Sequence, residues 1–191
     1  MRDFNKNIAM DRYNLGKVTT EGLGKKIYEK GMEALKGLMY TGDGAKPLKV
    51  LDLHCSHSFV RDFMGKGLEY AGLDPQLNFE RDGQKIVPDI QSDINNIPLQ
   101  DNTVDFMFAI GQRLAYGEYH QSIFEIERVI KSHGYLIVAL TRYWFQKGFN
   151  QLLFCYHGWQ YVKAIEVNYK IVDGESAKET SKYFAVYQYG K

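Results

Sequence analysis

The stretch Leu48-Lys-Val-Leu-Asp-Leu53, which continues as His54-Cys-Ser-His-Ser58, decides the fold that this sequence predicts. Its first six residues form a short apolar run with an aspartate near its end, which is the pattern of a buried strand in a parallel sheet. Open α/β sheets bind their ligands beyond the carboxyl ends of such strands. Asp52 and the turn after it therefore mark the expected ligand-binding edge.

Similar apolar runs recur along the chain and alternate with segments of helical periodicity. Strands alternating with helices predict a parallel sheet with right-handed crossovers. Two alternating runs near the C-terminal end, residues 161–169 and 183–189, flank a polar stretch and predict an antiparallel hairpin. The predicted fold class is therefore α/β, with a doubly wound, mostly parallel sheet. We expect further strands at residues 70–74, 88–92, 104–110 and 135–140, helices at about residues 23–38, 59–66 and 118–131, and weak helical character over residues 76–86.

The length of the chain, 191 residues, suits one domain with a sizeable core. Residues 1–22 are largely polar and show no clear periodicity. We therefore expect an N-terminal leader or lid over residues 1–22 and a single domain over residues 23–191.

The charge balance gives no reason to expect a nucleic acid or an anionic membrane as a partner. The chain carries 24 basic and 23 acidic residues, for a net charge of +1. No apolar run is long enough to cross a bilayer. Cys55 and Cys155 belong to no CxxC pair and are too few for a disulfide framework, so we expect reduced thiols and a cytoplasmic location.

Three acidic residues lie at or just after predicted strand ends: Asp52, Asp74 and Asp93. An acid at the end of the second strand can accept hydrogen bonds from both hydroxyl groups of a ribose. A second acid nearby can accept from the exocyclic amine of an adenine, so the pattern predicts a nucleoside-like ligand. The alternatives remain open: Asp74 before Pro75, and Asp93, are also typical turn residues, and Asp52 could orient the following loop.

Four segments together give the chain its resemblance to a known family. They are Val50-Leu-Asp-Leu53, Tyr70-Ala-Gly-Leu-Asp74, Asp93-Ile-Asn-Asn-Ile-Pro-Leu99 with the strand after it, and Glu127-Arg-Val-Ile-Lys-Ser-His-Gly-Tyr-Leu-Ile137. In order and spacing, residues 48–141 resemble the class I S-adenosylmethionine-dependent methyltransferases. The resemblance implies a Rossmann-like, seven-stranded sheet and S-adenosylmethionine as cofactor. It implies cofactor-binding positions at Asp52, His54, Ser56, Asp74, Pro75, Asp93, Ile94 and Ile110.

The loop after the first of these segments departs from the family pattern. The three glycines expected there fall on His54, Ser56 and Ser58. Glycine permits a positive φ and a close approach of ligand to backbone. Another residue in left-handed geometry costs on the order of 1–2 kcal/mol, and the imidazole of His54 could fill the volume of the cofactor's methionine part.

Two functions follow from these observations. The first is methyl transfer from S-adenosylmethionine to an unknown acceptor, with Tyr116, Tyr119 and His120 as candidates on the substrate side and no assigned catalytic residue. The second is a catalytically inactive methyltransferase fold that acts as a scaffold or binds a protein partner. His54, Cys55 and His57 match no closed zinc set, so no metal site is predicted.

Overall fold

The computed structural model describes residues 10–18, 23–39, 46–55, 60–77, 79–81, 83–110, 120–146, 158–173 and 176–190. Nine strands and three α-helices lie within them, together with one short 3-10 helix. The strands are β1 (Met10–Val18), β2 (Leu48–Leu53), β3 (Leu68–Leu73), β4 (Phe79–Arg81), β5 (Gln84–Ile86), β6 (Val104–Ala109), β7 (Ile130–Thr141), β8 (Trp159–Asp173) and β9 (Ser176–Tyr189). The helices are α1 (Leu23–Met39), α2 (His120–Val129) and α3 (Arg142–Gln146), and the 3-10 helix is η1 (Arg61–Phe63).

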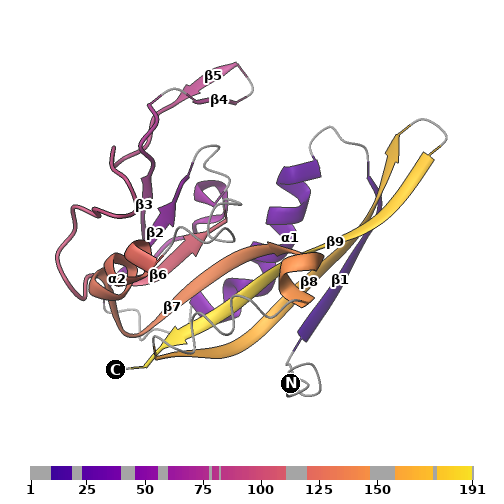
Figure 1. The fold of residues 1–191 in the computed structure, drawn as a ribbon. Coiled ribbons are helices and arrows are strands. Elements are labelled where there is room, and N and C mark those ends of the chain that lie inside the picture. The colour runs from indigo at the N-terminus through magenta and orange to yellow at the C-terminus, as the bar shows by residue number, and fades with distance from the viewer. Residues whose placement is uncertain are drawn as a thin grey trace.

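Seven strands form one sheet in the order β1-β8-β9-β7-β6-β2-β3 (Figure 1). The pairs β1/β8, β2/β3, β2/β6 and β6/β7 are parallel. Strand β9 runs antiparallel to both of its neighbours, β7 and β8. The predicted mostly parallel, seven-stranded α/β fold with a C-terminal hairpin is thus confirmed.

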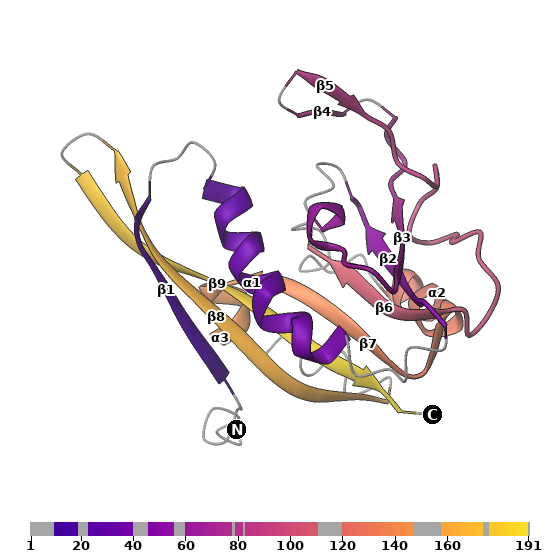
Figure 2. The ribbon, with the colours of Figure 1, turned by 180° about the vertical axis from the view of Figure 1, so that it is seen from behind.

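The hairpin of β8 and β9 reaches past the end of β7, as Figures 1 and 2 show. Thr141, the last residue of β7, pairs with Lys182 of β9, and Lys182 pairs with Val167 of β8. Pairing continues from there to Asp173 and Ser176. The hairpin therefore forms an arm that rises beyond the carboxyl end of the parallel strands.

The N-terminal part of the chain completes the other side of this arm. The N-terminal residues, which show no clear periodicity in the sequence, contain strand β1. This strand pairs in parallel with β8, and Met10 lies opposite Ala164. Arg12 of β1 forms an ion pair with Glu166 of β8 at 3.1 Å. No strand was expected at these residues, because β1 is polar and lies at the edge of the sheet, where apolar periodicity is weak.

Beyond β3, the sheet ends sooner than the sequence predicts. The strand expected at residues 88–92 is reduced to a single bridge between Leu73 and Ile90. The weak helix expected at residues 76–86 is instead the antiparallel pair β4/β5. Of the helix expected at residues 59–66, the described part contains only η1.

The helices cover the two faces of the sheet separately (Figures 1 and 2). On one face, α1 packs residues such as Ile27 and Leu35 against Phe184 and Val186 of β9. On the other face, α2 packs Ile123 and Ile126 against β6 and β7. A Cβ at Gly31 of α1 would lie 2.5 Å from the ring of Phe184, so α1 approaches the sheet closely there. Within the described residues, no helix has the length and apolarity needed to cross a membrane.

Candidate functional site

The ends of three neighbouring strands meet at one edge of the sheet. In the pairing of β2 with β3, Asp52 lies opposite Gly72 and Leu53 opposite Leu73. On the other side of β2, Leu53 lies opposite Ala109 of β6. Because these strands are parallel, the residues that follow them, among them His54, Asp74 and Ile110, emerge at the same edge.

Asp52 is buried, with only 3% of its surface exposed. Burial raises the pKa of its carboxyl group to about 7, and the nearby charge of Asp74 adds to the rise. The hydroxyl group of Tyr70 donates a hydrogen bond to Oδ2 of Asp52 at 3.0 Å, which opposes the rise, as does the charge of Arg61. Asp52 is therefore a buried acid that changes its charge near neutral pH.

Tyr70, Arg61 and Asp89 extend this cluster, and sequence reasoning missed all three. The guanidinium group of Arg61 lies 4.9 Å from the centre of the Tyr70 ring. Arg61 also forms an ion pair with Asp89, whose Oδ2 accepts the backbone N–H of Gly72 at 2.7 Å. β3 is the last strand of the described sheet, so on its outer side no further strand accepts this N–H group. Asp89 accepts the hydrogen bond instead.

His54, at a position where the resemblance leads us to expect glycine, adopts the left-handed backbone conformation, with φ of 55°. The next residue, Cys55, is buried, and its N–H donates to the carbonyl oxygen of Leu73 at 3.1 Å. A Cβ at Gly72 would lie 2.8 Å from Sγ of Cys55, so glycine at position 72 makes room for the thiol. The start of the loop is thus fixed against β3 despite the strain at His54.

Asp74 follows β3 and is buried, with 4% of its surface exposed. Its Oδ1 accepts the N–H of Gln76 at 3.0 Å, and its own N–H donates to the carbonyl oxygen of Ile90 at 3.1 Å. The turn geometry weighed as an alternative therefore exists around the exposed Pro75. This turn does not prevent Asp74 from binding a ligand, because its carboxylate has further lone pairs that can accept hydrogen bonds.

Asp93 begins a tight turn on the loop that leads to β6. Its Oδ1 accepts the N–H of Asn95 at 2.8 Å, and its carbonyl oxygen accepts the N–H of Asn96 at 3.0 Å. The carboxylate is exposed, whereas the side chain of Ile94 is buried in the core. A contact of Ile94 with a ligand would therefore have to come from its backbone.

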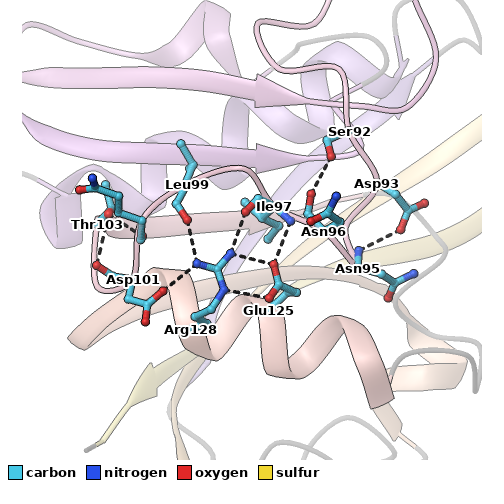
Figure 3. A network of polar contacts seen from close by, with 11 residues as sticks. Ser92, Asp93, Asn95, Asn96, Ile97, Leu99, Asp101, Thr103, Glu125 and Arg128 are labelled. Carbon is cyan, nitrogen blue, oxygen red and sulfur yellow. Dashed lines mark hydrogen bonds and ion pairs between the residues drawn. The ribbon is translucent and has the colours of Figure 1, made fainter.

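Arg128 of α2 anchors the same loop (Figure 3). Its guanidinium group donates to the carbonyl oxygens of Ile97 and Leu99, each at 2.7 Å, and to Asp101 at 2.7 Å. It also forms two hydrogen bonds of 2.8 Å with Glu125, whose Oε2 accepts the N–H of Ile97. The hydrogen bond from Arg128 holds the pKa of Glu125 below its usual range, so both charges persist at neutral pH.

Several of the predicted positions lie outside the described residues: Ser56, His57, Ser58, Tyr116, Tyr119 and the side chain of His120. Ile110, at the end of β6, is partly buried and packs against the α1 face of the sheet. In the part of the chain that the structure describes, no three His, Cys, Asp or Glu side chains gather as a metal site.

Comparison with known proteins agrees with this arrangement. A family model described as a methyltransferase domain matches residues 51–138. No curated protein matches the chain in sequence. Among solved structures, the fold is similar to that of a SAM-dependent methyltransferase from Aquifex aeolicus, with 18% identity, a TM-score of 0.56, and coverage of 84% of this chain and 96% of that chain.

Two further structures have a similar fold. One is the 1,6-didemethyltoxoflavin-N1-methyltransferase of Burkholderia thailandensis, solved with 1,6-didemethyltoxoflavin and S-adenosylhomocysteine: 10% identity, TM-score 0.58, and coverage of 88% of this chain and 83% of that chain. The other is a chain of the complex that contains the Haloferax volcanii Trm112 methyltransferase activator: 15% identity, TM-score 0.57, and coverage of 90% and 95%. At such identities the similarity concerns the fold.

Proposed function

We propose that the protein is a class I S-adenosylmethionine-dependent methyltransferase, which binds S-adenosylmethionine and transfers its methyl group to an acceptor; the match of a methyltransferase-domain model to residues 51–138 supports this proposal. One observation carries the proposal. Two buried acids, Asp52 and Asp74, stand at the carboxyl ends of adjacent parallel strands. This is the edge at which doubly wound sheets bind nucleosides.

Each residue of the edge has a distinct task in this proposal. Asp74 would accept hydrogen bonds from the ribose hydroxyl groups, because a carboxylate can serve them while it keeps the N–H of Gln76. Asp93, exposed on its turn, would accept from the adenine amine. Asp52, held by Tyr70, would keep the loop that begins at His54 in place.

When bound, S-adenosylmethionine supplies an electrophilic methyl group on a sulfonium centre. The protein would then act chiefly by orienting the acceptor in line with that group, because alignment alone lowers the barrier of such a transfer substantially. The Arg128 network would help to orient the cofactor, because it fixes the loop that carries Asp93 to helix α2. A location in the cytoplasm, where the buried thiol of Cys55 would stay reduced, is part of the proposal.

Calorimetry with S-adenosylmethionine and S-adenosylhomocysteine tests the proposal directly. We expect micromolar binding to the native protein. Asp74→Asn keeps an oxygen that can accept the N–H of Gln76, so it preserves the turn while it removes the charge. It should weaken binding by about tenfold or more. Glu80→Gln, which removes an exposed charge on the outlying β4 strand, is the matched control and should bind normally.

The alternative function, an inactive fold that binds a protein partner, is motivated by His54. A side chain at a position suited to glycine, with φ of 55°, stands at the start of the cofactor loop. Under this alternative, the folded protein shows no heat of binding with either compound at millimolar concentration. That result would overturn the methyltransferase proposal, whereas binding that Asp74→Asn weakens would support the cofactor site at Asp74.

A further inference from the structure

A second site lies away from the acids of β2 and β3. A pocket of about 430 Å³ opens between β1, β8, β9 and the start of α3. This volume falls within the range of small-molecule sites. The side chains that matter for its chemistry are Asn14, Arg142, Asn168, Lys170, Glu179 and Ser181.

The strand register places the pocket on the carboxyl side of the sheet. Thr141, the last residue of β7, is level with Lys182 and Val167. Asn168 and Ser181 pair one residue further along the hairpin, and α3 starts directly after Thr141. The pocket therefore belongs to the same edge of the sheet as Asp52 and Asp74, on the arm that extends beyond it.

The floor of the pocket is a row of polar residues across three strands. Asn14 of β1 pairs with Asn168 of β8, which pairs with Ser181 of β9, so the three side chains project from the same face. Ser181 is buried, and its hydroxyl group donates to Oδ1 of Asn168 at 2.6 Å. Because this bond uses the oxygen of Asn168, the amide nitrogen is left as a hydrogen-bond donor toward a ligand.

The charges around the floor have a positive excess. Among the described residues, Arg142 has no carboxylate partner. Glu166, on the same face, accepts from Arg12 at 3.1 Å and from the hydroxyl group of Tyr183 at 2.6 Å. Lys170 and Glu179 are 3.8 Å apart, and the Glu179 side chain is 83% exposed, so solvent screens that pair.

We propose that this pocket binds the anionic oxygen group, a carboxylate or a phosphate, of a small acid. The guanidinium group of Arg142 can bind such a group with two parallel hydrogen bonds, and the amide of Asn168 supplies a further donor.

Binding of two simple anions tests the proposal without the cofactor. Succinate and inorganic phosphate are titrated separately into the native protein, and the side-chain amide signals of Asn14 and Asn168 are followed by NMR. We expect saturable shifts with at least one anion, and the anion that binds more tightly identifies the acid class. Arg142→Gln should weaken that binding by about tenfold or more. Arg142→Lys keeps the charge but loses the two parallel N–H donors, so its affinity for the anion should lie between those of the native protein and Arg142→Gln.

Lys85→Gln is the matched control, because it removes an exposed positive charge on the outlying β5 strand, which does not line the pocket. It should bind both anions as the native protein does. If neither anion shifts the amide signals, or if Arg142→Gln binds like the native protein, the pocket is not an anion site. Cofactor calorimetry on the native protein separates the two proposals: if S-adenosylmethionine fails to bind while Arg142-dependent anion binding persists, the methyltransferase function fails and the anion site stands.

Discussion

Tyr70 donates a hydrogen bond from its hydroxyl group to Oδ2 of Asp52 at 3.0 Å, and this bond stabilises the ionised form of that buried acid. The two residues lie on adjacent parallel strands, β3 and β2. Burial nevertheless raises the pKa of Asp52 to about 7. The folded protein therefore holds a proton there that the unfolded chain releases at much lower pH.

We predict a pH-dependent stability difference between the native protein and Asp52→Asn. The native state binds the Asp52 proton more tightly than the unfolded state does, so the contribution of Asp52 to stability falls as pH rises from about 4 to about 7. Over this window the loss is on the order of 4 kcal/mol. Urea unfolding across the pH range should show Asp52→Asn gaining stability relative to the native protein as pH rises. A constant difference at all pH values would contradict the raised pKa.

The close contact between α1 and β9 gives a second prediction. A Cβ at Gly31 would lie 2.5 Å from the Phe184 ring, which also makes an edge contact with Tyr28. Gly31→Ala should therefore destabilise the protein by about 1–3 kcal/mol through overpacking. Gly37→Ala is the control, because no atom lies within 4 Å of a Cβ there and alanine favours the helix by about 1 kcal/mol. Thermal unfolding should move in opposite directions for the two variants.

The left-handed conformation of His54 predicts a difference between two small substitutions. Both His54→Gly and His54→Ala remove the imidazole, but only glycine accepts a φ of 55° without a Cβ penalty. His54→Gly should be more stable than His54→Ala by about 1 kcal/mol in urea unfolding. It should also bind S-adenosylmethionine more tightly than the native protein, because ligand can approach the backbone more closely. Weaker binding would show instead that the imidazole contacts the cofactor.

Arg128 predicts a local effect on the loop that carries Asp93. Arg128→Gln removes the hydrogen bonds to the carbonyl oxygens of Ile97 and Leu99, and leaves Glu125 without its cation. We expect the free energy of unfolding to fall by about 2–3 kcal/mol. Amide hydrogen exchange should accelerate more at residues 94–103 than in the rest of the protein. Arg128→Lys keeps the charge but cannot reach all partners of the guanidinium group. It should therefore lose less stability than Arg128→Gln. Uniform loss of protection throughout the sheet would argue against a local role.

The central strands could be predicted from sequence because their apolar runs are short and either continuous, as at residues 135–140, or interrupted by a single aspartate, as at residues 50–53. The same runs located Asp52 and Asp74 at strand ends, where the structure has them. The hairpin at β4 and β5 also had a signal, Asp82-Gly83 between two short runs, which is a common two-residue hairpin turn. Gly83 does adopt a positive φ of 73°.

Other parts of the site carry no such signal. Tyr70, Arg61 and Asp89 come from a strand, a short 3-10 helix and a loop, and they meet at β3, the last strand of the sheet in the part of the chain that the structure describes. Asp11, Arg12 and Asn14 make β1 polar, so nothing local distinguishes that strand from a loop. Its identity depends on β8, a partner that only the folded chain supplies.

The pairing of β1 with β8 also constrains the order in which the protein folds. The contact between Arg12 and Glu166 joins residues that are 154 positions apart in the chain. Loop closure over such a separation is entropically costly, and contacts of this kind form late and slowly. During synthesis β1 therefore lacks its partner strand until β8 has left the ribosome, so a chain stalled before residue 159 exposes the polar edge of β1.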